Sequence, residues 1–114
     1  MSTITTHVLD TARGRPARGV VVRLDKAGGP LSWTTLAERS TDDDGRVRDL
    51  LAPGDAMAPG IYRLVFLAGR YFEGLGETTF YPEIPIVFEI REGAQHYHVP
   101  LLLSPFGYST YRGS

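Results

Sequence analysis

Three histidines and one arginine are the side chains of this sequence whose types suit proton transfer and substrate binding. The histidines are His7, His96 and His98, and Arg46 directly follows the pair Asp44-Gly45. A neutral histidine, with an unperturbed pKa of about 6.5, can take a proton from water at physiological pH. An arginine stays cationic and presents a planar fork of donors, which matches a flat substrate rich in carbonyls. Together such groups could deprotonate a water molecule and stabilise an oxyanion during hydrolysis.

Other routes to hydrolysis have less support in the sequence. Cysteine is absent, which excludes thiolate nucleophiles, disulfides and cysteine-ligated zinc. The serines near the C-terminus lack the surrounding pattern of a nucleophile elbow, so we assign no covalent nucleophile. His96 and His98 are two residues apart, and with His7 they could supply three ligands for a catalytic zinc ion. A metallohydrolase is therefore one alternative.

Length and charge limit the remaining possibilities. The chain of 114 residues has 42% hydrophobic and 22% charged residues, which indicates a single globular domain over residues 1–114. A net charge of −1 gives no electrostatic basis for binding nucleic acid or an anionic membrane. The N-terminus does not resemble a signal peptide, and no apolar run approaches the roughly 20 residues of a membrane span. We therefore expect a soluble cytoplasmic protein.

The elements that must position these residues are short strands. Thirteen Gly and eight Pro divide the chain into segments rich in β-branched and aromatic residues. The expected strands cover residues 4–9, 19–25, 31–36, 46–47, 61–67, 86–90, 97–103 and 107–111, with loops at 28–30 and 53–59 and room for one short helix within 69–76. This pattern predicts an all-β protein, either an antiparallel sandwich or a barrel. Pro100 cannot donate to a ladder, so its strand should be an edge or be interrupted there.

Side-chain alternation along the strands separates the core from the surface. The odd-numbered residues of the segment 97–103 form an apolar face that we predict to be core. The opposite face carries His96 and His98 together with Pro100 and Leu102, and His7 shares a face of the first strand with Leu9. A surface that mixes histidine with such apolar side chains is poorly suited to open water. It would suit a groove that a second subunit closes.

Three segments of the chain resemble the transthyretin-like family. Thr6-His7-Val8-Leu9-Asp10 with Arg13-Gly14-Arg15-Pro16-Ala17 is similar to the opening strand and turn of that family. The segment 96–105 with Tyr108-Ser109-Thr110 is similar to its last hairpin. The terminal Tyr111-Arg112-Gly113-Ser114 resembles the tetrapeptide that separates the hydrolases of the family from its vertebrate hormone carriers, and Asp44-Gly45-Arg46 is a fourth match.

The resemblance implies a fold, an assembly and a reaction. The fold is a β-sandwich of two four-stranded sheets with one short helix, assembled as a homotetramer with active sites at the interface between dimers. The hydrolases of the family open the ring of 5-hydroxyisourate, a product of urate oxidation, to give 2-oxo-4-hydroxy-4-carboxy-5-ureidoimidazoline, and they need no metal or organic cofactor. The resemblance implies catalytic residues at His7, Arg46, His98 and Ser114, and substrate-binding residues at His7, Arg46, Tyr111, Arg112 and Gly113.

Each of these residues is expected to have a distinct role. His7 and His98 position and deprotonate the water, and either could be the base. Arg46 binds the substrate and steadies the oxyanion, Tyr111 contacts the substrate plane, and the rest of the tail completes the pocket. His96 receives no role in the chemistry. The alternative from another class is a carrier that binds a small hydrophobic ligand in the same channel, although the carriers lack the channel histidines and the terminal tetrapeptide.

Overall fold

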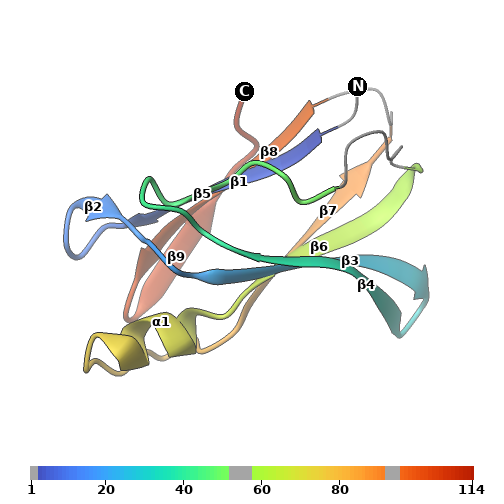
Figure 1. The fold of residues 1–114 in the computed structure, drawn as a ribbon. Helices are drawn as coiled ribbons and strands as arrows, with labels where there is room; N and C mark the ends of the chain where they lie inside the picture. The colour runs from blue at the N-terminus through green and yellow to red at the C-terminus, as the bar shows by residue number, and fades with distance from the viewer. Residues whose placement is uncertain (1–2, 52–57, 92–95) are drawn as a thin grey trace.

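The chain folds into two β-sheets that enclose a common core, with one short helix beside them (Figure 1). The computed structural model describes residues 3–51, 58–91 and 96–114. The first sheet contains β1 (Thr3–Asp10), β2 (Arg15–Pro16), β5 (Arg46–Val47), β8 (His96–Ser104) and β9 (Gly107–Thr110). The second sheet contains β3 (Val21–Gly29), β4 (Ser32–Ser40), β6 (Gly60–Phe66) and β7 (Ile84–Ile90). The helix is α1 (Ala68–Gly74).

The strand order is β2-β1-β8-β9 in the first sheet, where β5 also pairs with β1, and β4-β3-β6-β7 in the second. The prediction of an all-β sandwich with one short helix is confirmed, although the first sheet has five strands in place of the expected four. One pairing departs from a fully antiparallel sandwich, because β1 and β8 run parallel. These two strands are joined through most of the chain, so no tight hairpin forces them to run in opposite directions.

Most element boundaries differ from the prediction by one or two residues, β2 was not expected, and the larger differences lie at β3 and β4. Strands β3 and β4 continue into the predicted loop at 28–30 and meet in a tight turn, and two register shifts in their pairing absorb the irregularity. The predicted strand 107–111 ends at Thr110, and the helix expected within 69–76 occupies Ala68–Gly74. Most of the predicted loop at 53–59 lies outside the described residues.

The core follows the predicted alternation. The odd-numbered side chains of β8 are all buried: Tyr97, Val99, Leu101 and Leu103. They pack in one cluster with buried residues of β1, β3 and β6 and with Phe72 of α1. The even-numbered residues of β8 consequently face outward, and this face carries both of its histidines.

Pro100 marks an interruption in the pairing of β8 with β9. The regular pairing ends at Leu101 opposite Thr110, and contact resumes as an isolated bridge between His98 and Gly113. Between these points the Thr110 hydroxyl donates to the Pro100 carbonyl at 2.7 Å. Strand β8 is central in its sheet. Of the two predicted possibilities, an edge strand or an interruption, the structure therefore confirms the interruption.

A buried carboxylate fixes α1 to β1. Asp10 accepts a hydrogen bond from the Tyr71 hydroxyl at 2.6 Å and others from the backbone N–H and guanidinium of Arg13 at 3.0 and 3.1 Å. Burial alone would raise the pKa of Asp10, but these hydrogen bonds lower it overall. Burial and the contact with Asp10 raise the pKa of Tyr71 to about 12. The helix is thus held against the end of β1.

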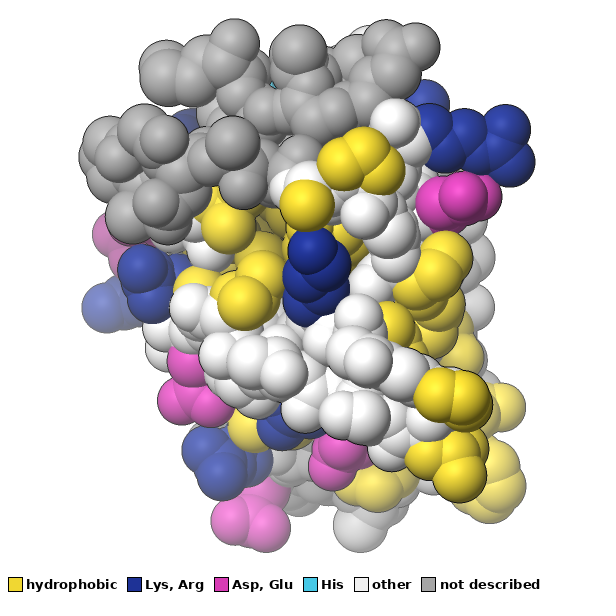
Figure 2. Space-filling view, turned by 90° about the vertical axis from the view of Figure 1, so that its right-hand side faces the viewer, with side chains coloured by type: hydrophobic (Ala, Val, Ile, Leu, Met, Phe, Trp, Pro, Cys, Tyr) yellow, Lys and Arg dark blue, Asp and Glu magenta, His cyan; other side chains and the backbone are white. Residues whose placement is uncertain are grey.

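Large aromatic side chains stay exposed on the single chain. Phe80 and Phe106 are 71% and 73% exposed, Phe80 packs edge-on against Tyr81, and Tyr81 packs against Tyr108. Figure 2 shows hydrophobic side chains gathered along one edge of the face that it presents. Exposed apolar groups in contact with one another are typical of a protein-binding surface. Within the described ranges, no helix has the length and apolar character needed to cross a membrane.

Candidate functional site

The outer face of β5, β1 and β8 carries three of the predicted catalytic residues. Arg46 of β5 pairs with His7 of β1, while β8 places His98 opposite Thr5 and Pro100 opposite His7. Because residues two apart on a strand share a face, Arg46, His7 and His98 all point to the same side of the sheet. The three strands lie side by side below the C-terminus in Figure 1.

A cavity of about 370 Å³ opens on this face. Its lining residues are Thr5, Thr6, Arg46, Arg48, His96, His98 and Ser114. The cavity therefore brings together Arg46, His98 and Ser114 from three separate parts of the chain. His7 is not among the lining residues, although its backbone is in register with that of Arg46.

A tight turn before β5 presents Arg46 to the cavity. Gly45 has φ of +75°, and a side chain there would place Cβ 2.4 Å from the Val8 carbonyl oxygen, so only glycine fits. The Gly45 carbonyl accepts a hydrogen bond from the Val8 backbone N–H at 2.7 Å. This close approach of the turn to β1 is what sets Arg46 opposite His7.

Asp42 shapes the same turn, although no functional role was expected for it from the sequence. One carboxylate oxygen of Asp42 accepts from the backbone N–H groups of Asp44 and Arg46, both at 2.9 Å, and the other accepts from the Arg48 guanidinium at 2.9 Å. The hydrogen bond from Arg46 is the largest influence that lowers the pKa of Asp42. Asp42 thus binds the backbone of one cavity arginine and the side chain of another. The signal available in the sequence was its turn composition before Arg46.

The ring of His98 is held on two sides. The Thr5 hydroxyl oxygen lies 2.7 Å from its Nδ1. On another side, Gly113 lies so close that an added Cβ would be 2.5 Å from His98 Cδ2. The Gly113 backbone N–H also donates to the His98 carbonyl at 2.8 Å. The terminal segment is therefore bound to β8 at the candidate base.

Electrostatics favours the neutral form of His98. Its partial burial lowers its pKa, and the positive charge of Arg46 and the neighbouring His96 and His7 lower it further. A hydrogen bond with the Thr5 backbone acts in the opposite direction but is smaller. A neutral imidazole at physiological pH can accept a proton, as a general base must.

Tyr111 and Arg112 lie beside a different hollow. They line a groove of about 260 Å³ with residues of β7 (Ile86, Val87, Phe88 and Glu89), and His98 borders this groove as well. The guanidinium carbon of Arg112 lies 4.8 Å from the centre of the Tyr97 ring, in cation–π geometry. Because β9 ends at Thr110, strand alternation does not fix the side on which Tyr111 lies. The terminal tetrapeptide is therefore shared between two sides of β8.

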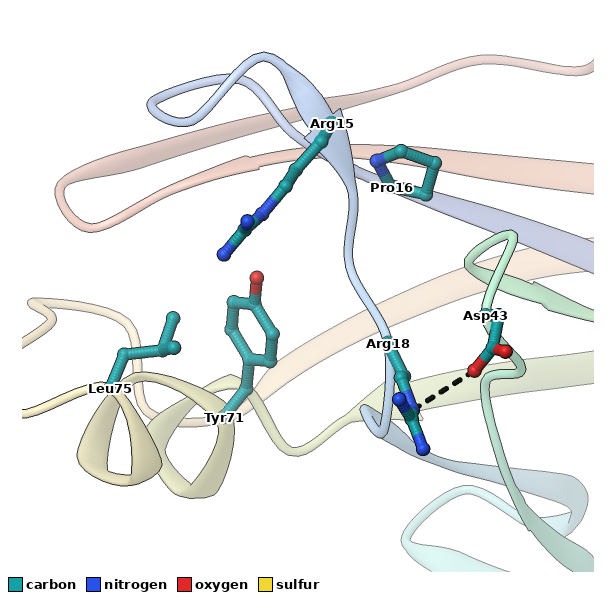
Figure 3. A pocket seen from close by; sticks show the side chains of 6 residues that line it. All are labelled: Arg15, Pro16, Arg18, Asp43, Tyr71 and Leu75. Atoms are coloured by element: carbon teal, nitrogen blue, oxygen red, sulfur yellow. Dashed lines mark ion pairs between the residues drawn. The ribbon is translucent and has the colours of Figure 1, made fainter.

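A third hollow, of about 470 Å³, lies between β2 and α1 and contains no predicted site residue (Figure 3). Arg15 and Tyr71 approach each other across it, and Arg18 forms an ion pair with Asp43 at 3.0 Å. The only hydroxyl hydrogen of Tyr71 is committed to Asp10. The Tyr71 oxygen thus offers no donor to a ligand, and the carboxylates offset the cations. The contact between Tyr71 and Asp10 beside this hollow holds α1 against the first sheet.

The zinc alternative finds no support in the geometry. Within residues 3–51, 58–91 and 96–114, no three His, Cys, Asp or Glu side chains are arranged to hold a metal ion. The rings of His96 and His98 are stacked at 6.2 Å with 12° between their planes, and both face the Thr5 hydroxyl. One nitrogen of each ring, Nε2 of His96 and Nδ1 of His98, is thus directed to this hydroxyl group.

Known proteins provide an independent comparison. A chain with this sandwich and a His-Arg cavity on one sheet has the architecture of a transthyretin-like protein. The model of the HIUase/Transthyretin family matches residues 4–113, and the chain belongs to that family. The 5-hydroxyisourate hydrolase of Salmonella typhimurium is 50% identical over 111 residues, which covers 97% of this chain and 80% of that one.

Solved structures agree with the family assignment. The 5-hydroxyisourate hydrolase of Klebsiella pneumoniae superposes with a TM-score of 0.88 at 38% identity, and the match covers 100% of both chains. Sea bream transthyretin in complex with thyroxine also reaches a TM-score of 0.88, at 32% identity, over 96% of this chain and 93% of that one. The fold alone therefore does not separate hydrolase from carrier.

Proposed function

We propose that this chain hydrolyses 5-hydroxyisourate to 2-oxo-4-hydroxy-4-carboxy-5-ureidoimidazoline in the degradation of urate. The observation that carries the proposal is the cavity in which His98, with its lowered pKa, and Arg46 stand together. The similarity of almost the whole chain to proteins named 5-hydroxyisourate hydrolase supports the choice of substrate.

In the proposed reaction His98 is the general base. It takes a proton from water as the water oxygen bonds to a ring carbonyl carbon, and Arg46 donates hydrogen bonds to the developing oxyanion. When the tetrahedral intermediate collapses, the carbon–nitrogen bond breaks and the proton held by His98 passes to the leaving nitrogen. The ring carbonyl carbon becomes a carboxyl group. The chemistry needs no metal and no organic cofactor.

The remaining site residues have supporting roles in this proposal. His7, opposite Arg46, helps to orient the water and the substrate. Ser114 closes one side of the cavity, and Gly113 fits against the ring of the base. Tyr111 and Arg112 border the adjoining groove, which His98 also lines, and would contact a substrate from that side.

We also propose that the chain works as a homotetramer with its sites at the interface between dimers. The mixed histidine and apolar face of β1 and β8, the exposed aromatic cluster of Phe80, Tyr81 and Tyr108, and the exposed Phe106 support an assembly that covers them. Sedimentation analysis should give a mass of four chains, and a monomer at micromolar concentration would contradict the assembly. The cytoplasmic location stays a prediction for cell fractionation.

The deciding experiment follows the decay of 5-hydroxyisourate made in place from urate and urate oxidase. We expect the absorbance of this short-lived intermediate to fall faster when the protein is present. His98→Ala and Arg46→Ala should lower the rate by orders of magnitude while circular dichroism stays unchanged. Arg18→Ala, at an exposed ion pair outside the cavity, is the matched control and should keep full activity. Wild-type rates in both site variants would refute the site.

The sea bream complex makes a carrier the competing function, because transthyretin binds thyroxine on the same fold. Calorimetric titration with thyroxine tests this alternative on the same sample. Tight thyroxine binding combined with an unchanged spontaneous decay of 5-hydroxyisourate would establish a carrier in place of a hydrolase.

A further inference from the structure

The Thr5 hydroxyl lies between two imidazole rings. Its oxygen is 2.7 Å from Nδ1 of His98 and 3.4 Å from Nε2 of His96. A hydroxyl has one hydrogen to donate but can accept two hydrogen bonds. It can therefore donate to only one of the two rings, and its bond with the other requires that ring to supply the proton.

The backbone of Thr5 identifies which ring supplies the proton. Burial, Arg46 and the neighbouring histidines lower the pKa of His98, whereas a hydrogen bond with the Thr5 backbone raises it. A backbone carbonyl can only accept, so the bond favours a proton on the adjacent ring nitrogen. Nδ1 is the ring nitrogen that lies 2.7 Å from the Thr5 hydroxyl oxygen, so a hydrogen on Nδ1 could be donated to Thr5. The hydroxyl is then free to donate towards His96.

From this arrangement we propose that Thr5 is a positioning residue that holds His98 in the tautomer protonated on Nδ1. Nε2 is then left with its lone pair available at the cavity. Within the described part of the chain, Thr5 is the hydrogen-bond partner of the His98 ring, and Nε2 has none. The proposal rests on the proposed function only where it assigns Nε2 as the base.

The tautomer matters because a base must present a lone pair to water. With the proton on Nε2 instead, His98 would offer the cavity a donor and could not deprotonate water. Thr5 accepts from Nδ1 both before and after Nε2 takes its proton, so its hydrogen bond does not need to rearrange during the reaction. Such a fixed partner stabilises the imidazolium as it forms.

Thr5→Val and Thr5→Ser test the proposal, because valine matches threonine in shape and serine keeps the hydroxyl. Nitrogen-15 NMR of the histidine ring reports the tautomer without any substrate. We expect the wild type and Thr5→Ser to show His98 protonated on Nδ1, and Thr5→Val to show a shifted or mixed population. In the decay assay, we expect Thr5→Val to lower kcat about tenfold with KM little changed, and Thr5→Ser to restore most of the rate.

Thr11→Val is the matched control, since the Thr11 hydroxyl donates to a carbonyl of β8 at its far end, away from the cavity. It should leave the His98 tautomer and the rate unchanged. A His98 ring protonated on Nε2 in the wild type, or an unaltered tautomer in Thr5→Val, would overturn the proposal whatever the activity. A wild-type protein that shows the expected tautomer but does not accelerate decay would instead refute the proposed function.

Discussion

Gly113 offers a sharp test of the site, because replacing it with alanine adds a Cβ atom directly against the His98 ring. The added Cβ would lie 2.5 Å from His98 Cδ2 and 3.3 Å from Pro100 Cγ. Carbon atoms in contact settle at about 3.5–4.0 Å, so the ring or the tail must move by about 1 Å. Displacement of a catalytic group by that amount costs up to about 100-fold in rate. We therefore expect Gly113→Ala to lower kcat/KM by about 10- to 100-fold, or about 1.4–2.7 kcal/mol in the barrier.

The effect on stability should be small. Gly113 is joined to β8 by one isolated bridge, and its neighbours Arg112 and Ser114 are exposed, so the tail can swing aside without disturbing the core. We expect the free energy of unfolding to change by less than about 0.5 kcal/mol, as for surface substitutions. Loss of activity would then report the position of His98 and not unfolding.

Kinetics of 5-hydroxyisourate decay and thermal melting of the same samples measure both quantities. Gly107→Ala is the matched control, since a Cβ there would meet only the Ser104 side chain, at an ordinary contact distance of 3.7 Å. It lies in the same sheet and should leave kcat/KM near the wild-type value. If Gly113→Ala retained kcat/KM within about twofold of wild type, the idea that the tail braces the base would be wrong.

Three further predictions concern the base, the turn and the helix. Because burial and the nearby Arg46 lower the pKa of His98 from its ordinary value of about 6.5, kcat/KM should fall on the acid side with a midpoint below pH 6.5. A midpoint at or above 6.5 would contradict the lowered pKa of the base. Asp42→Ala removes the acceptor of the Arg46 backbone N–H, so kcat/KM should fall about tenfold in the decay assay. An unchanged kcat/KM would show that the turn keeps its shape without the Asp42 carboxylate. Tyr71→Phe removes one of the three hydrogen bonds that the buried Asp10 accepts, the other two coming from Arg13, and should lower the free energy of unfolding by about 1–3 kcal/mol in urea melts, with kcat unchanged for the folded fraction.

Much of the fold could be predicted because its strands are short, separated by Gly and Pro, and alternate in polarity. The buried face of β8 and the interruption at Pro100 both follow from local chemistry. The direction of β1 relative to β8 does not, since it depends on the path of the chain between two distant segments. The extension of β3 and β4 through the glycines was missed because hairpin pairing outweighed their low strand propensity.

The residues of the candidate site could be predicted only from the motifs that resemble the family. Residue types alone indicate that His98 and Arg46 could act, whereas their neighbours are set by contacts between remote residues. Thr5 and His98 are 93 positions apart, and no local pattern pairs them. Asp42 looked like an ordinary turn residue, because its role depends on where the following strand docks. The assignment of His7 and the tail to catalysis stays a prediction.

The parallel pairing of β1 and β8 gives the site its geometry. In parallel register, Thr5 stands beside His98, and His7 lies two residues further on, beside Pro100. Because the proline at this point cannot donate to β9, the ladder opens there, and the terminal segment returns to β8 at Gly113 against the His98 ring. The imidazole is thus held by a hydroxyl from one neighbouring strand and by glycine from the other side, with Arg46 across β1. A shift of β1 by one residue would turn both Thr5 and His7 into the core, so the same register that buries Val8 also positions the candidate base.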